Sequence, residues 1–213
     1  FFRGRFMGLL KLLIEDPLTF ALLAIPLLYS IIVHELAHGW VALSMGDPTA
    51  KNAGRLTLNP LSHLDPIGTI MLFIVGFGWA RPVPVNLGYI RDYRKGLVLV
   101  SSAGIVANMI FAFLAVLLLK GLAPAPGSSV GIFLTYLAQI NIILAAFNLI
   151  PIPPLDGSKI LMGFLPDRWQ DALARIEPYG FFIIIALLFV GALNPLIRFF
   201  RWLILIPIGF ILS

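Results

Sequence analysis

Cysteine is absent from this chain of 213 residues, and charged side chains are scarce. The lack of cysteine excludes disulfide bridges, thiolate metal ligands and cysteine nucleophiles, so any metal must be held by histidine and carboxylate groups. Charged residues make up 12% of the chain and apolar residues 60%, a balance that excludes an ordinary water-soluble domain. The basic residues behind the net charge of +5 are spread over connecting segments, which favours contact with anionic lipid headgroups and argues against nucleic-acid binding.

Long apolar runs, separated by short polar or proline-containing stretches, account for most of the sequence. The first run begins at Glu15-Asp16-Pro17, a helix-start pattern, and ends at Gly46-Asp47-Pro48. Further runs that can cross a bilayer, at about 20 residues per crossing, occupy residues 96–119, residues 130–150, and a shorter pair at 179–193 and 196–212. We therefore expect an all-α integral membrane protein, a bundle of about four to six transmembrane helices.

Three segments do not fit a spanning helix. Residues 1–14 mix basic and apolar side chains and are typical of an interfacial amphipathic segment. Residues 55–58 alternate polar and apolar side chains, which predicts a short β-hairpin-like segment. The apolar stretch 67–80 is too short to cross the bilayer, so we interpret it as re-entrant or irregular.

His34-Glu35-Leu36-Ala37-His38 lies inside the first long run. On a helix the i, i+4 spacing places both imidazoles on one face, one turn apart, where they can bind one metal ion. In metalloproteases with this pattern the glutamate is not a ligand; it takes a proton from the metal-bound water and later delivers one to the leaving amine. A charged group at the centre of a membrane helix costs about 2.5–3.5 kcal/mol, so three ionisable groups together indicate a function. Structural hydrogen bonding within the bundle core is the alternative.

A catalytic zinc takes three protein ligands and leaves its fourth position to water, so a third ligand must come from another part of the chain. Asp156 follows the proline-rich break 151–155, which can enter the membrane without helical structure. We therefore expect Asp156 to complete a site for one zinc ion per chain. Two alternatives remain open: Asp156 as the N-cap of a short helix that begins near Ser158, or His63 with Asp65 as the ligand pair.

Asparagines within two apolar runs are further candidates. Asn148 is placed either to donate a hydrogen bond to a developing oxyanion or to bond a neighbouring helix carbonyl. Gly104 and Asn108 are spaced i, i+4 in another run. We interpret that pair as helix packing, in which the glycine allows close approach and the asparagine supplies an interhelical hydrogen bond.

The two motifs together resemble the site-2 protease family of intramembrane zinc metalloproteases, of the compact type without PDZ or CBS domains. The resemblance is carried by His34-Glu35-x-x-His38 and by Asn148-x-x-Pro151-x-Pro153-Pro154-Leu155-Asp156-Gly157. It implies zinc held by His34, His38 and Asp156, with Glu35 as the catalytic base and Asn148 binding substrate or stabilising the oxyanion. It also implies a membrane-protein substrate that is cleaved in or near a transmembrane segment.

The expected organisation is a single membrane-embedded peptidase domain over residues 1–213, with a catalytic core at 17–165 and C-terminal helices at 178–212. If the loop after the first long helix is cytoplasmic, nine basic residues lie on that side and six on the other. This excess favours an active site nearer the cytoplasmic side. A metal-ion transporter is the alternative function, but the internal repeats typical of transporters are missing from the sequence.

Overall fold

The computed structural model describes residues 8–75 and 78–212, and within them it contains helices and no strands. The expected all-α architecture is confirmed. In chain order the helices are α1 (Gly8–Glu15), α2 (Pro17–Ser44), α3 (Thr49–Asn52), α4 (Pro66–Val75), α5 (Tyr93–Leu122), α6 (Ser129–Asn148), α7 (Asp156–Phe164), α8 (Asp167–Ile176), α9 (Gly180–Phe189) and α10 (Leu193–Leu212).

Four helical stretches are long and apolar enough to cross a membrane, within the range expected from the sequence: Pro17–Ser44, Tyr93–Leu122, Ser129–Asn148 and Asp167–Phe189. At most 33% of the residues in the most apolar window of each stretch are buried inside the protein. Most of their apolar side chains therefore face outwards, as they do in a helix surrounded by lipid. The run 196–212, which we expected to cross, belongs to α10 and is not among the four.

Helix α2 begins and ends where its sequence signals lie. The Asp16 carboxylate accepts a hydrogen bond of 3.0 Å from the backbone N–H of Thr19, and Pro17 occupies the first turn, where its missing N–H costs nothing. At the other end Gly46 adopts φ +106°, a conformation that favours glycine and turns the chain away from the helix axis. The result is a helix of 28 residues that carries the His-Glu-x-x-His motif in its second half.

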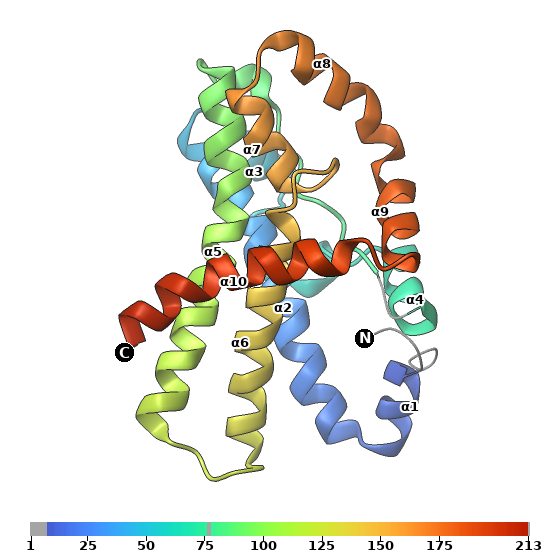
Figure 1. Ribbon diagram of the computed structural model, residues 1–213, viewed down its shortest axis with the longest axis vertical. Coiled ribbons are helices and arrows are strands. Elements are labelled where there is room, and N and C mark those ends of the chain that lie inside the picture. Colours follow the sequence, from blue (N-terminus) through green and yellow to red (C-terminus); the bar gives the residue numbers. More distant parts are fainter. Residues whose placement is uncertain (1–7, 76–77, 213) are drawn as a thin grey trace.

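Helix α5 packs against α2, α6 and α7. Helices α8 and α9 lie to one side of these helices, on the right in Figure 1. Helix α10 runs across α5 and α6 instead of parallel to them (Figure 1). Ile204 and Ile208 of α10 are buried in one apolar cluster with Ile105 of α5 and Ile142 of α6. The three helices α2, α5 and α6 therefore form the frame to which the short helix α7 is added.

The prediction of a β-hairpin-like segment at residues 55–58 is wrong, because no strand forms there. The neighbouring extended segment contains Pro82 and Pro84, which have no backbone N–H to donate to a ladder. A single bridge between Leu64 and Ala80 is present instead. Arg55 contributes through its side chain, whose guanidinium donates to the carbonyl of Arg81 at 2.8 Å.

Two other irregular segments contain short helices. The stretch expected to be re-entrant contains α4, whose ten residues are too few to cross a bilayer. Asp65 precedes this helix and accepts a hydrogen bond of 2.7 Å from the N–H of Gly68. The N-terminal interfacial segment contains α1, whereas its basic residues Arg3 and Arg5 lie outside the described residues.

Candidate metal centre

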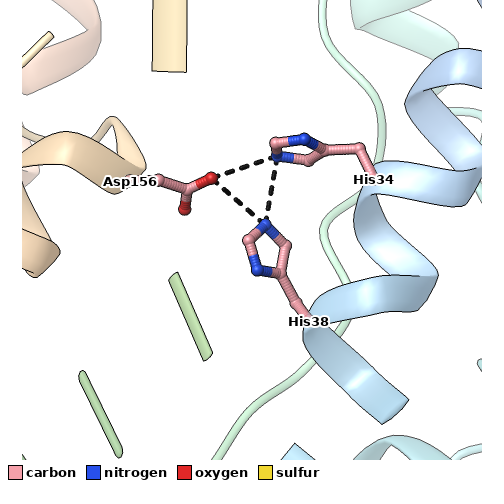
Figure 2. Close-up of side chains that lie close together, drawn as sticks. All are labelled: His34, His38 and Asp156. Atoms are coloured by element: carbon pink, nitrogen blue, oxygen red, sulfur yellow. Dashed lines mark hydrogen bonds and ion pairs between the residues drawn. The ribbon is translucent and has the colours of Figure 1, made fainter. Parts of the chain in front are cut away.

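The side chains of His34, His38 and Asp156 converge on one point (Figure 2). The two Nε2 atoms are 3.1 Å apart, and Asp156 Oδ2 lies 3.1 Å from His34 Nε2 and 3.2 Å from His38 Nε2. Each of the three residues is at most 9% exposed. Among the described residues this is the one group of three or more histidines and carboxylates that could hold a metal ion.

Both imidazoles are oriented by a hydrogen bond on the ring nitrogen that faces away from the group. His38 Nδ1 lies 2.7 Å from the backbone carbonyl of Val100, and His34 Nδ1 lies 2.6 Å from the Oδ1 atom of Asn108. These oxygens are acceptors, so each Nδ1 carries the proton and each Nε2 presents a lone pair towards Asp156. Asp156 Oδ2 is buried and has no hydrogen-bond partner, so three electron-pair donors meet in a buried space.

The spacing of these three atoms suits zinc. Ligands bound at 2.0–2.1 Å in a tetrahedral site lie about 3.3 Å from one another, close to the observed separations of 3.1–3.2 Å. A cation at the centre also removes the repulsion between the three lone pairs. Two histidines and one carboxylate leave the fourth tetrahedral position open, which is the ligand set of a catalytic zinc site.

Asp156 reaches the two histidines because of the break between α6 and α7. Helix α7 begins at Asp156 itself, its N-cap residue is Leu155, and no side chain caps it. The alternative in which Asp156 is the N-cap is therefore wrong. A Cβ atom on Gly157 would lie 2.2 Å from the carbonyl oxygen of Leu149, so only glycine lets the start of α7 pack this closely on the end of α6.

Glu35 lies on α2 between the two histidines, is half-buried, and is not a member of the metal-binding group. Its Oε2 atom accepts a hydrogen bond of 2.9 Å from the backbone N–H of Val83. Asp47, just beyond α2, accepts a second one of 2.6 Å from the N–H of Asn86. Two carboxylates, Glu35 in the second half of α2 and Asp47 just after it, thus hold the extended segment 81–86. The segment therefore lies against Glu35, the candidate catalytic base.

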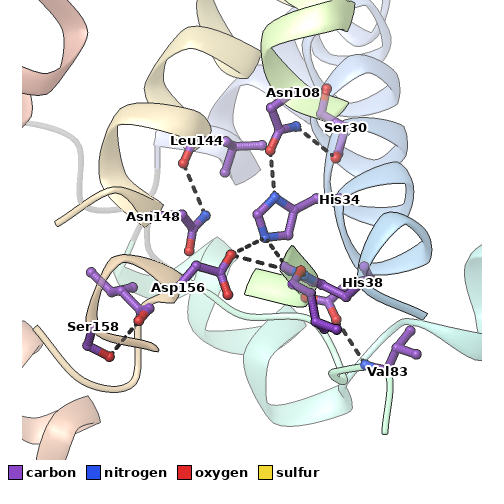
Figure 3. A network of polar contacts seen from close by, with 12 residues as sticks. Ser30, His34, His38, Val83, Asn108, Leu144, Asn148, Asp156 and Ser158 are labelled. Carbon is purple, nitrogen blue, oxygen red and sulfur yellow. Dashed lines mark hydrogen bonds and ion pairs between the residues drawn. The ribbon is translucent and has the colours of Figure 1, made fainter. Parts of the chain in front are cut away.

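Asn148 ends α6 and lies beside Asp156 (Figure 3). Its amide nitrogen donates to the carbonyl of Leu144, one turn earlier in the same helix, at 3.0 Å. The hydrogen bond to a helix carbonyl that we considered is therefore present, within its own helix. The same nitrogen carries a second N–H, which that bond does not use.

His63 and Asp65 do not join the metal-binding group. The His63 ring is 1% exposed, and its Nε2 atom lies 2.8 Å from the carbonyl of Thr57. Asp65 instead caps the beginning of α4. The alternative in which this pair supplies the metal ligands finds no support in the geometry.

Asn108 is the site residue that our reading of the sequence missed. We interpreted Gly104 and Asn108 as packing residues, but Asn108 contacts the His34 ring and Gly104 lies directly against both histidines. A Cβ atom on Gly104 would lie 2.5 Å from His34 Cε1 and 2.6 Å from His38 Nε2. Their i, i+4 spacing placed them on one face of α5, but it carried no signal that this face meets the metal-binding residues of α2.

Comparison with known proteins agrees with this arrangement. Residues 123–191, which include Asp156, match the model of peptidase family M50. YwhC of Bacillus subtilis is 44% identical to the chain over 187 residues, which cover 84% of each protein. Rip2 of Mycolicibacterium smegmatis is 32% identical over 78% of this chain and 66% of its own length. The names of both relatives assign them provisionally to the zinc metalloproteases, and no solved structure matches the chain.

The expected cofactor and enzyme class are therefore confirmed. The metal-binding group has a geometry that suits zinc, and two of its members lie on a long apolar helix. A relative of nearly equal length also bears the name of a zinc metalloprotease. The protein is a zinc metalloprotease with several membrane-spanning helices, and it belongs to the site-2 protease family, peptidase family M50.

Proposed function

We propose that this protein is an intramembrane endopeptidase that hydrolyses peptide bonds in or near the transmembrane segments of other membrane proteins. The observation that supports this most directly is that two members of the metal-binding group, His34 and His38, lie on α2, a helix long and apolar enough to span a membrane. In this proposal His34, His38 and Asp156 bind one zinc ion per chain. Three protein ligands would leave a bound zinc ion able to take up one water molecule.

Zinc, when bound, lowers the pKa of its water towards 7 and so supplies a nucleophile at neutral pH. Glu35 follows His34 directly on α2, and its carboxylate accepts the proton from the attacking water. The same carboxylate then delivers a proton to the amine of the departing peptide. The hydrogen bond from Val83 N–H to Glu35 Oε2 orients this carboxylate. Asn148 donates the second N–H of its amide to the developing oxyanion.

The proposed site lies below the membrane surface. His38 is seven residues before Met45, which places the ligands roughly 10 Å inside that end of α2 at 1.5 Å per residue. We propose that this end faces the cytoplasm. We also propose that residues 17–165 form the catalytic core of one peptidase domain and that 178–212 form its C-terminal helices.

The test uses purified protein in liposomes together with a panel of single-span membrane proteins. We expect cleavage at one or a few bonds in or near the span, identified by mass spectrometry of the products, and loss of cleavage when a chelator removes the zinc. Glu35→Gln is the control variant, because it removes the base and keeps the three proposed ligands. It should bind zinc normally and cleave at least about 100-fold more slowly.

Several results would contradict the proposal. A chelator-insensitive reaction would rule out zinc chemistry, and cuts confined to soluble segments far from the span would rule out intramembrane proteolysis. Loss of zinc in Glu35→Gln would make Glu35 a ligand instead of the base.

A further inference from the structure

Two buried amides connect His34 to helices α5 and α6. Asn108 of α5 and Asn141 of α6 are both fully buried. Asn108 Oδ1 lies 2.6 Å from His34 Nδ1, and Asn108 Nδ2 donates to the carbonyl of Ser30 at 3.2 Å (Figure 3). The same Nδ2 atom donates to Asn141 Oδ1 at 2.7 Å. Asn141 Nδ2 donates in turn to the carbonyl of Leu137 at 2.8 Å. Every helix of the central frame, α2, α5 and α6, contributes to this network.

Two backbone carbonyls decide which atoms of the two amides donate and which accept. The carbonyls of Ser30 and Leu137 belong to the backbone and can only accept, so the amide nitrogens of Asn108 and Asn141 must face them. With its nitrogen turned to Ser30, Asn108 presents its oxygen to the His34 ring. That oxygen also only accepts, so His34 Nδ1 must carry the proton and Nε2 must be free to bind a metal ion.

We propose that Asn108 is a positioning residue for the zinc site: it holds the His34 ring in the orientation and tautomer in which Nε2 binds the metal. This inference rests on the proposed function, in which His34 is a zinc ligand. Asn141 supports Asn108, because it accepts one of the two N–H groups of the Asn108 amide. Hydrogen bonds of this kind to the second ring nitrogen tune metal affinity by orienting the ligand.

Packing alone does not account for this arrangement. Burying two amides in an apolar bundle is unfavourable unless their polar groups are hydrogen-bonded, and an apolar pair of similar volume would pack the helices without that requirement. The network ends on the ring nitrogen of a metal-binding residue. His38 provides the comparison within the same site, since its Nδ1 is held by the backbone carbonyl of Val100, which no side-chain substitution removes.

The first test compares zinc affinity in two variants of nearly equal volume change. Asn108→Leu removes the acceptor of the His34 N–H and should weaken zinc binding about 10–100-fold in competition with a chelator. Asn141→Leu removes an equally buried amide but leaves the hydrogen bonds from Asn108 to His34 and Ser30. Its zinc affinity should fall less than about tenfold. If Asn108→Leu does not fold, Asn108→Ala provides the same comparison without added bulk.

A second measurement is independent of affinity and of activity. The chain has only three histidines, so protein labelled with ¹⁵N-histidine gives imidazole signals that single variants can assign. In the zinc-loaded protein the Nδ1–H protons of His34 and His38 should both exchange slowly with water. Substitution of Asn108 should speed the exchange of the His34 proton and leave that of His38 unchanged. A purely structural effect would change both signals together.

The outcomes separate this inference from the proposed function. Normal zinc binding by His34→Ala would contradict both, because His34 would then not be a ligand. Loss of zinc in His34→Ala, together with wild-type affinity and an unchanged His34 signal in the Asn108 variant, would overturn the positioning role alone. Equal losses of affinity in Asn108→Leu and Asn141→Leu, with both histidine signals altered, would also overturn it.

Discussion

Three histidines are available to this chain, and the surroundings of each ring decide what it can do. His34 and His38 each have one nitrogen engaged by an oxygen and the other turned towards Asp156. His63 is equally buried, its Nε2 atom is engaged by the carbonyl of Thr57 and its Nδ1 atom has no hydrogen-bond partner, but among the described residues it belongs to no group of three metal-binding side chains. At the residue scale it is convergence with two other ligands, and not burial or a free ring nitrogen alone, that distinguishes the candidate ligands.

Removal of single ligands should therefore separate these residues. His34→Ala, His38→Ala and Asp156→Ala should each lose stoichiometric zinc and all cleavage, because two remaining ligands hold the ion poorly and leave the water wrongly placed. His63→Ala should keep one zinc per folded chain, although the loss of its hydrogen bond and of buried volume lowers stability by about 1–3 kcal/mol. Elemental analysis of the purified folded protein measures the difference. Zinc absent from His63→Ala but present in Asp156→Ala would reverse the assignment.

The close approach of α5 to α2 depends on a missing side chain. Gly104 lies so close to the two imidazoles that there is no room for a Cβ atom between them. At this position the backbone of α5 itself covers one side of the site. Any larger residue there must push the rings or the helix away from their positions. At the scale of the element, the distance between α2 and α5 therefore also fixes the positions of the two imidazole rings.

Gly104→Ala should therefore lower zinc affinity about tenfold or more, since overpacking of this kind costs roughly 1–3 kcal/mol. Gly121→Ala is the matched control: it lies in the same helix, and a Cβ atom there meets nothing within 4 Å. We expect that variant to bind zinc and cleave substrate like the wild type. Chelator competition on both proteins provides the comparison, and unchanged affinity in Gly104→Ala would show that α5 can move without disturbing the site.

The carboxylate of Asp47 holds the far end of the segment 81–86. Burial by itself raises the pKa of Asp47, but hydrogen bonds from Thr49 and from the N–H of Asn86 hold this pKa below its usual value of 3.8. A carboxyl group whose pKa is lowered by folding stabilises the fold above its unfolded pKa. That contribution is lost as the pH falls through the lowered value.

Asp47→Ala should accordingly reduce the Tm at neutral pH and make residues 81–89 more sensitive to added protease. The difference in Tm between the variant and the wild type should shrink as the pH falls below about 4. The wild-type carboxyl group is then increasingly protonated and loses the stabilisation that the variant lacks at every pH. Asp92→Ala, which removes the exposed N-cap of α5, is the control. It should lower the Tm modestly and leave the protease sensitivity of 81–89 unchanged. An equal change in that sensitivity would show that Asp47 does not hold the segment.

The whole molecule has two distinct ends. Helices α3 and α7 lie at one end of the frame, and the connection between α5 and α6 lies at the other (Figure 1). The candidate site is nearer the end with α7, since Asp156 is the first residue of that helix. The candidate site therefore lies nearer to the α3 and α7 end of the molecule than to the connection between α5 and α6.

The absence of cysteine makes this orientation easy to measure, because any introduced cysteine is the only thiol in the chain. Asn52→Cys reports on the exposed end of α3, and Ala125→Cys on the exposed connection after α5. With the proposed orientation, a membrane-impermeant maleimide added to intact cells should label Ala125→Cys and not Asn52→Cys. Inverted vesicles should give the opposite pattern. The reversed result would place the active site nearer the external side.

Local spacing is enough to determine part of this protein. The relation between His34, Glu35 and His38 follows from a helical pitch, and three of the four spanning stretches follow from the length of apolar runs, because both are properties of neighbouring residues. The fourth stretch, Asp167–Phe189, also includes the polar helix α8, which lies outside the apolar runs. Asp156 also became a candidate from its sequence, since the prolines before it prevent an uninterrupted helix. The family resemblance depends on the same short motifs.

The tertiary structure alone decided which distant segments meet. That Asn108 faces His34, that Gly104 covers both rings, and that the prolines of 81–86 leave a single bridge instead of a hairpin all depend on packing between segments far apart in the chain. The placement of α10 across the frame has the same origin. Helical periodicity gives the face on which a residue lies, but the partner of that face is chosen by the lowest free energy of the whole bundle, to which every helix contributes.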